Sequence, residues 1–175
     1  MLAFLWPFSY LALLVFILYF LLRPIIRGAV YFPTKPRSVD IMIELSGVRP
    51  GQKIADIGSG DGRILIAFAE KGIEAHGYEI NPLLVWRSRQ AIRRARLENR
   101  AFVHWKDFWR VNFSGFDAII VYGMTHIMDG LENKLGKEVR PGTAVVSNIY
   151  QFPHWKPVAQ KEKIYLYRVG TDGKE

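Results

Sequence analysis

The sequence predicts an α/β fold in which a mostly parallel β-sheet carries helices on both faces. Short β-rich runs alternate with helical patterns from residue 53 onward, which is typical of such sheets. A glycine-rich loop, Asp56-Ile57-Gly58-Ser59-Gly60-Asp61-Gly62, joins the first run to the first helical pattern. Proline and glycine mark where helices begin and end. Because sheets of this kind bind ligands at the carboxyl ends of their strands, the ends of the runs are the places to search for a site.

Local patterns define each element in turn. Residues 38–45 have apolar side chains at helical spacing and are followed by Gly47 and Pro50-Gly51, so we predict a short amphipathic helix. Asn81-Pro82 combines an N-cap with proline at the first helical position, and Pro141-Gly142 ends a helix. The predicted strands are residues 53–57, 74–79, 101–105, 117–122 and 143–150, with two more within 156–169. The predicted helices are residues 38–45, 62–71, 82–96 and 127–139.

The first 22 residues contain no charged side chain, and a stretch of that length can span a bilayer as one helix. A signal peptide would need a basic n-region and a small-residue cleavage site, and neither is present. The basic residues near this run all follow it: Arg23, Arg27, Lys35 and Arg37. We therefore expect a single-pass anchor, with the remainder on the cytoplasmic or organelle-interior side. The expected parts are the anchor and its basic flank at 1–27, a connecting segment at 28–52 and the α/β domain at 53–175.

The chain carries a formal net charge of +8. Much of the excess is an arginine cluster: Arg87, Arg89, Arg93, Arg94, Arg96 and Arg100. A solvated helix face, attraction to anionic lipid headgroups and nucleic-acid binding are the possible interpretations. No RNA-binding signature accompanies the cluster, so no nucleic acid is expected as a partner. The chain has no cysteine and its four histidines lack ligand spacing, so no metal is expected either.

Acidic residues accompany the ends of the first three predicted strands. Asp56 precedes the glycines and suits the amino group of a methionine moiety; Glu79 ends the second strand and suits ribose hydroxyls. Asp107 follows the third strand and suits the amino group of adenine. Each has a plainer alternative, since Asp56 and Asp61 also suit helix caps, Glu79 a surface position and Asp107 a loop. The glycine spacing, G-x-G-x-G, and the acids together favour S-adenosylmethionine over a dinucleotide.

Several motifs together resemble one family. They are the glycine loop with Arg63-Ile64, Gly77-Tyr78-Glu79-Ile80-Asn81-Pro82-Leu83-Leu84-Val85-Trp86, Asp107-Phe108-Trp109, Leu131-Glu132-Asn133-Lys134-Leu135 and Phe152-Pro153-His154-Trp155. The chain resembles the membrane-anchored seven-β-strand lysine methyltransferases, whose mitochondrial members modify the ATP synthase c subunit and the adenine nucleotide translocase. The resemblance covers almost the whole chain, implies a Rossmann-like seven-β-strand methyltransferase fold, and makes residues 28–52 a pre-methyltransferase segment.

The resemblance also implies where S-adenosylmethionine lies. Phe32, Pro33 and Thr34 are expected to close over the cofactor. The full set of expected cofactor contacts is Pro33, Thr34, Asp56, Ile57, Gly58, Ser59, Gly60, Asp61, Gly62, Glu79, Ile80, Asn81, Asp107, Phe108 and Tyr122. The chain departs from the family at Tyr122-Gly123-Met124, because the family has phenylalanine in the first of these positions. It departs again at residues 147–151. Both departures fall on the substrate side of such folds.

A lysine amine must be neutral to accept a methyl group, and an apolar aromatic slot favours the neutral form by desolvation. Tyr122, Tyr150, Phe152 and Trp155 are the candidates for this slot, the last three as substrate contacts. His126 titrates in a suitable range to accept the proton, although a histidine at a helix start also suits a cap or a surface position.

The sequence thus predicts a membrane-anchored enzyme that methylates lysines of membrane or membrane-near proteins. A lipid or small-molecule methyltransferase, or a non-catalytic membrane module of the same fold, are the alternatives.

Overall fold

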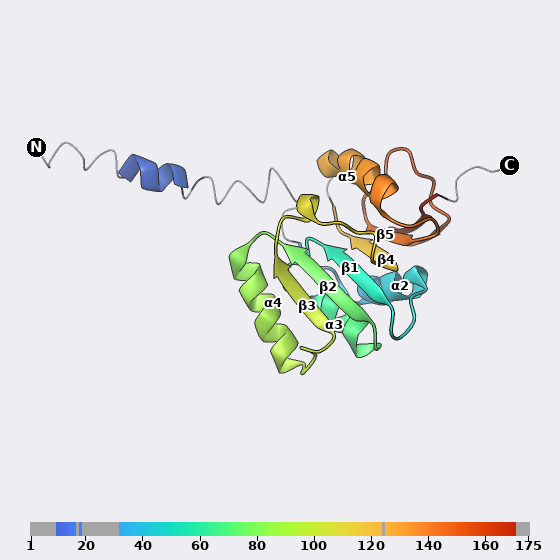
Figure 1. The fold of residues 1–175 in the computed structure, drawn as a ribbon, viewed down its shortest axis with the longest axis horizontal. Coiled ribbons are helices and arrows are strands. Elements are labelled where there is room, and N and C mark those ends of the chain that lie inside the picture. The colour runs from blue at the N-terminus through green and yellow to red at the C-terminus, as the bar shows by residue number, and fades with distance from the viewer. Residues whose placement is uncertain (1–9, 17, 19–31, 124, 171–175) are drawn as a thin grey trace, which may run out of the picture.

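The computed structural model describes residues 10–16, 18, 32–123 and 125–170, which Figure 1 draws in colour. The predicted anchor at residues 1–22, and its flank to residue 27, lie mostly outside these residues. Among the residues described, none of the helices has both the length and the apolar character needed to cross a bilayer. The sheet and the helices that pack on it all lie between Phe32 and Gly170.

Seven strands form one sheet in the order β3-β2-β1-β4-β5-β7-β6. They are β1 (Lys53–Ile57), β2 (Glu74–Glu79), β3 (Ala101–Trp105), β4 (Ala118–Val121), β5 (Ala144–Asn148), β6 (Ala159–Lys161) and β7 (Ile164–Arg168). The first five strands pair in parallel, as predicted, whereas β7 runs antiparallel between β5 and β6. Strand order reverses between β1 and β4, so a ligand site is expected at the carboxyl ends of these two strands.

Helices cover both faces of the sheet, which confirms the predicted layering (Figure 1). The helices are α2 (Pro36–Ser46), α3 (Arg63–Glu70), α4 (Pro82–Arg94) and α5 (Thr125–Glu138), with a short 3-10 helix η2 (Phe108–Arg110). Met42, Phe68 and Ile92, from α2, α3 and α4, are buried in one hydrophobic cluster against the sheet. Leu131 of α5 and Phe113 of the segment after η2 are buried in a second cluster on the other face.

The start of α4 is fixed by the residues that predicted it. The side chain of Asn81 accepts hydrogen bonds from the backbone N–H groups of Leu83 and Leu84, at 3.0 and 3.4 Å. Pro82 occupies the first helical position, where no intrahelical N–H is needed. The N-terminus of α4 is therefore held at the carboxyl end of β2, beside the glycine loop.

Several predicted bounds were too long. The predicted strand 143–150 ends at Asn148, because Ile149 has a left-handed backbone (φ 69°) that breaks the strand. The predicted helix 82–96 ends at Arg94, and Arg96 is likewise left-handed (φ 58°). The 3-10 helix η2 was not predicted, because three residues are too short to show a helical period.

Candidate active site

The glycine loop follows β1 and turns sharply into α3. Gly58, Gly60 and Gly62 all have positive φ (76°, 55° and 83°), a conformation that residues with a Cβ rarely adopt. A Cβ on Gly62 would collide with the side chain of Ser88 in α4. A Cβ on Gly58 would meet nothing within 4 Å, so open space lies beside the loop there. The glycines thus serve both the turn and the approach of a ligand.

Asp56 is held in the interior at the carboxyl end of β1. It is 1% exposed, and within the described part of the chain its Oδ2 atom receives no hydrogen bond. Burial raises the pKa of Asp56 to about 8, and the nearby carboxylates of Glu79 and Asp61 contribute to the increase. A buried acid with an unused oxygen that lines a cavity is suited to bind a cationic group of a ligand.

Glu79 ends β2 and holds the loop at the same edge of the sheet. Its Oε2 accepts from the backbone N–H of Gly60 at 3.1 Å, and its Oε1 accepts from that of Asn81 at 2.8 Å. Burial raises the pKa of Glu79, and the backbone hydrogen bonds oppose that increase. Since a carboxylate has about four lone-pair sites, Glu79 retains capacity for ligand hydroxyl groups.

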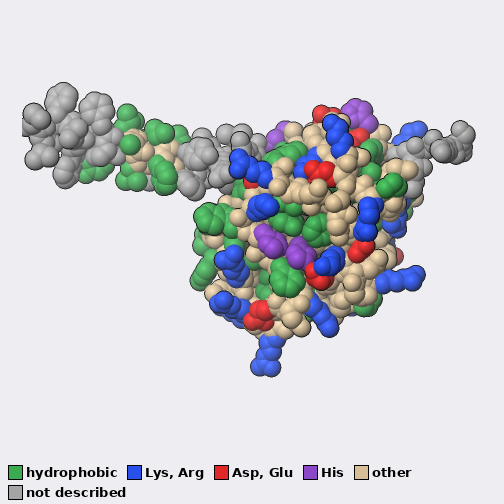
Figure 2. Space-filling model, in the orientation of Figure 1, with side chains coloured by type: hydrophobic (Ala, Val, Ile, Leu, Met, Phe, Trp, Pro, Cys, Tyr) green, Lys and Arg blue, Asp and Glu red, His purple; other side chains and the backbone are tan. Residues whose placement is uncertain are grey.

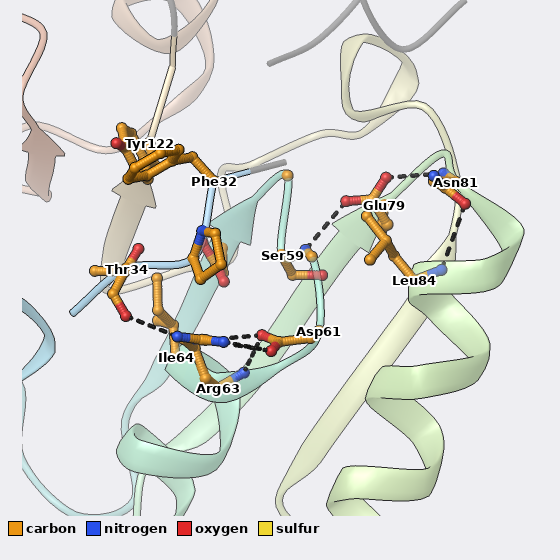
Figure 3. Close-up of a pocket in the computed structure, with 14 residues that line it drawn as sticks. Phe32, Thr34, Ser59, Asp61, Arg63, Ile64, Glu79, Asn81, Leu84 and Tyr122 are labelled. Atoms are coloured by element: carbon orange, nitrogen blue, oxygen red, sulfur yellow. Dashed lines mark hydrogen bonds and ion pairs between the residues drawn. The ribbon is translucent and has the colours of Figure 1, made fainter. Parts of the chain in front are cut away.

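Arg63 links the glycine loop to the segment that precedes α2, as Figure 3 shows. Its Nε and Nη2 atoms donate to the two carboxylate oxygens of Asp61 at 3.0 and 2.7 Å. Its Nη1 atom donates to the backbone carbonyl of Thr34 at 3.0 Å. We call this Asp61–Arg63–Thr34 connection the clasp. It holds the segment 32–34 over the loop.

These groups surround one cavity at the carboxyl edge of the sheet (Figure 3). Its lining contains these predicted cofactor residues: Pro33, Thr34, Asp56, Gly58, Ser59, Gly60, Asp61, Glu79, Asn81 and Tyr122, together with Phe32. It also contains Arg63, Ile64 and Leu84, which the sequence reasoning missed. These three lie in the first turns of α3 and α4 and belong to the motifs named above, and that membership was the available signal.

The other predicted cofactor residues lie outside the lining of this cavity. Ile57 and Phe108 are buried in the hydrophobic cluster beneath α5, and Gly62 is the N-cap of α3. The backbone carbonyl of Ile80 accepts from the Trp105 indole. Their assignment as cofactor contacts stays a prediction.

Asp107 also lies outside that lining. It is buried and caps η2, where its Oδ1 accepts from the backbone N–H of Trp109 at 3.1 Å. The plainer alternative for Asp107 was a loop position, and the structure gives it a capping role that the sequence did not predict. The predicted contact with adenine is untested.

A second cavity shares four residues with the first: Phe32, Pro33, Thr34 and Tyr122. Its other lining residues are Lys35, Ser38, Asn148, Ile149, Glu162, Lys163 and Ile164. The Tyr122 ring meets Phe32 edge-on, with 6.4 Å between ring centroids. Burial raises the pKa of Tyr122, and the electrostatic effect of Tyr150 raises it further. The Tyr122 hydroxyl is therefore neutral at physiological pH. Tyr122 therefore forms a polar but uncharged boundary between the two cavities.

The remaining predicted substrate residues occupy different surroundings. Phe152 is buried against Trp155 and Tyr167, with centroid distances of 4.9 and 5.1 Å, so its ring belongs to the core. Tyr150 is half-buried, and its electrostatic effect helps to raise the pKa of Tyr122. His126 is exposed in the first turn of α5 and is not part of the lining of either cavity. The roles proposed for these four residues stay predictions.

Fold and site together define an α/β methyltransferase-type domain. Its ligand cavity lies where strand order reverses, at the carboxyl ends of β1 and β4. The family model of the ANTKMT methyltransferase domain matches residues 56–159, which begin at the cavity acid and end in β6. The chain belongs to this family, and the predicted resemblance is confirmed.

Curated relatives are consistent with that membership. The chain is 38% identical over 127 residues to the human lysine N-methyltransferase of the ATP synthase c subunit; the match spans 73% of this chain and 54% of the relative. It is 35% identical over 148 residues to the mouse adenine nucleotide translocase lysine N-methyltransferase, covering 82% and 64%. A protein-lysine N-methyltransferase of Saccharolobus islandicus is 30% identical over 150 residues, covering 80% and 93%. The chain spans about half the length of the human relative.

Solved structures agree on the fold. An RNA methyltransferase from Salinibacter ruber, in complex with S-adenosyl-L-homocysteine, superposes with a TM-score of 0.73 and 30% identity, covering 79% of this chain and 92% of that one. A methyltransferase from Thiobacillus denitrificans, also with S-adenosyl-L-homocysteine, gives a TM-score of 0.59 at 18% identity, covering 67% and 50%. The second likeness concerns the fold alone.

Proposed function

We propose that this protein is a membrane-anchored methyltransferase that uses S-adenosylmethionine to methylate the ε-amino group of lysine in membrane or membrane-near proteins. The observation that carries the proposal is the buried, incompletely hydrogen-bonded Asp56 in a cavity that lies within the region matched by the family. Related chains named as lysine methyltransferases support the acceptor.

The cavity residues fit this cofactor. Asp56 offers an unused carboxylate oxygen to an ammonium group, and Glu79 has acceptor capacity for two ribose hydroxyls. Open space beside Gly58 lets a ligand approach the backbone closely. When bound, S-adenosylmethionine supplies a methyl group on a sulfonium sulfur that is also its leaving group. The protein must then bind and orient the two reactants and exclude water from them.

The second cavity is suited to hold the acceptor side chain. A lysine with a pKa of about 10.4 is almost fully protonated at pH 7, so its neutral form must be favoured at the site. Tyr122 and Phe32 give the boundary between the cavities an aromatic surface, which desolvates an amine and lowers its pKa. The neutral Tyr122 hydroxyl can accept a hydrogen bond from the amine and orient its lone pair.

The proposed anchor rests on the sequence. The 22 charge-free residues at the N-terminus are followed by basic residues, and the described domain begins at the cavity rim with Phe32. Confinement to a membrane raises the local concentration of membrane-bound acceptors. The proposed location is therefore single-pass, with the domain on the cytoplasmic or organelle-interior side.

The test is mass spectrometry of a membrane proteome incubated with the full chain and cofactor carrying a deuterated methyl group. Labelled lysines in proteins are the expected result, and Asp56→Ala or Glu79→Ala should remove the label. Val158→Ala, at an exposed position outside both cavity linings, is the matched control. Label confined to lipid extracts or to RNA would contradict the proposal.

A further inference from the structure

The outward side of α4 is hydrophobic at its N-terminal turn and basic beyond it. Leu83 is 54% exposed and Trp86 is 58% exposed. Arg87, Arg93 and Arg94 are also exposed and share this side, because positions three, four and seven apart face the same way on a helix. The opposite, buried side consists of Leu84, Val85, Ser88 and Ile92. The hydrophobic end lies at the carboxyl edge of the sheet, next to the cavity residue Asn81.

Trp105 extends this hydrophobic area from the neighbouring strand. It ends β3, is 63% exposed, and its Nε1 atom donates to the backbone carbonyl of Ile80 at 3.0 Å. That hydrogen bond fixes the indole beside the turn from which α4 begins. We call the surface formed by Leu83, Trp86, Trp105 and the three outward arginines the α4 face. Figure 2 shows hydrophobic and basic side chains together along the edge of the molecule that α4 forms.

The positive charge of this surface is not neutralised by neighbouring acids. The helix contains four arginines and no acidic residue, and no acid within the described residues forms an ion pair with any of the four. Exposed tryptophan next to unpaired arginine is the pattern of surfaces that bind anionic membranes.

We propose that the α4 face docks on the headgroup layer of a membrane that contains anionic lipid. The proposed anchor places such a surface nearby, since only residues 23–31 separate the apolar run from Phe32. Fully extended, those residues span at most about 30 Å. Leu83 and Trp86 lie in the first turns of α4, and Asn81 and Leu84 at the same end of the helix line the cavity, so docking would bring the cavity close to the bilayer surface. The lysines presented to it would then be those at the membrane–water interface.

The absence of cysteine allows a direct test with single substitutions. The full chain is reconstituted in vesicles of phosphatidylcholine, with or without phosphatidylglycerol, after an environment-sensitive fluorophore is attached to Leu83→Cys. Val158→Cys, equally exposed (53%) and beside the opposite edge strand β6, is the matched control. With phosphatidylglycerol present, lipid-attached quenchers should quench the label at position 83 about two-fold or more over that at 158. The Arg87→Gln, Arg93→Gln, Arg94→Gln variant, or high salt, should abolish the difference.

Other results would overturn the inference. Equal quenching at the two positions in anionic vesicles, or a difference that does not depend on phosphatidylglycerol or on the arginines, would exclude docking on anionic lipid. Shielding of position 83 only after membrane proteins are added would identify the α4 face as a protein-binding surface instead. The readout does not involve methyl transfer, so it stays separate from a failure of the proposed activity.

Discussion

Asp56 keeps its proton near neutral pH, because burial raises its pKa to about 8. A bound cation favours the ionised form, so cofactor binding at pH 7 should release a proton from this residue. Asp56→Asn should remove that release and weaken binding roughly 10- to 100-fold, as expected for a lost charged hydrogen bond. Calorimetry in two buffers of different ionisation enthalpy measures both quantities. Because titration of the ligand itself affects both proteins equally, the same proton release from each would refute the assignment.

The raised pKa of Asp56 also affects stability. Between pH 3.8, its ordinary pKa, and about 8, the folded protein holds a proton that the unfolded chain has lost. Stability should therefore fall as pH rises through that window. Asp56→Asn removes this cost, and we expect it to raise Tm at pH 8 by roughly 2–8 °C, corresponding to about 1–2 kcal/mol. Thermal unfolding at pH 5 and pH 8 tests this, and an increase of equal size at both would contradict the explanation.

Among the elements, the clasp joins α3 to the segment that covers the cavity. Arg63→Ala removes the donors to Asp61 and Thr34, so residues 32–34 should open more often. We expect about ten-fold weaker cofactor binding, chiefly through faster dissociation. Arg63→Lys should be intermediate, because lysine lacks the planar fork that reaches both partners. Stopped-flow dissociation, with amide hydrogen exchange at Phe32 and Thr34, checks this.

A matched control for the clasp is Lys161→Ala, which removes an exposed ion pair with Glu44 at 2.6 Å. Exposed pairs of this kind contribute about 0–1 kcal/mol, so cofactor dissociation should not change. If Arg63→Ala left both dissociation and exchange unchanged, the clasp would have no role in covering the cavity.

Elements with strong local signals were predictable from the sequence. Strands β1, β2 and β3 cover the residues that the β-rich runs of the sequence predicted. Asn81-Pro82 begins α4 as expected. The antiparallel insertion of β7 was not predictable, because no local pattern specifies that β7 pairs with β5 as well as with its neighbour β6. Strand ends were also missed where a single residue, Ile149, leaves the extended conformation.

The same distinction applies to the site. Asp56 and Glu79 were recognisable because motif and strand end coincide, and the structure brings both to one cavity. Arg63 was not, because its role depends on reaching Thr34, which precedes it by 29 residues. Asp107 shows the opposite problem, since an acid at a strand end is equally suited to a cap, and here it caps η2. Local chemistry predicts candidates, and the tertiary fold selects among them.

Across the whole molecule, one edge of the sheet collects the features that bear on function. The first cavity, the second cavity beyond Tyr122 and the hydrophobic end of the α4 face all lie at the carboxyl ends of the parallel strands. The segment entering this edge at Phe32 comes from the proposed anchor. This arrangement fits an enzyme whose acceptors are held at a membrane rather than captured from solution.

Removal of residues 1–31 tests this arrangement, because every strand of the sheet and every helix that packs on it lies beyond them. The shortened chain should bind S-adenosylmethionine with unchanged affinity, since the described cavity lining begins at Phe32. Its transfer to acceptors in intact membranes should fall by about ten-fold or more, because confinement no longer raises their local concentration. Adding the same acceptors in detergent should narrow the difference between the two chains. Equal transfer by both chains to intact membranes would mean that residues 1–31 do not serve as an anchor for this activity.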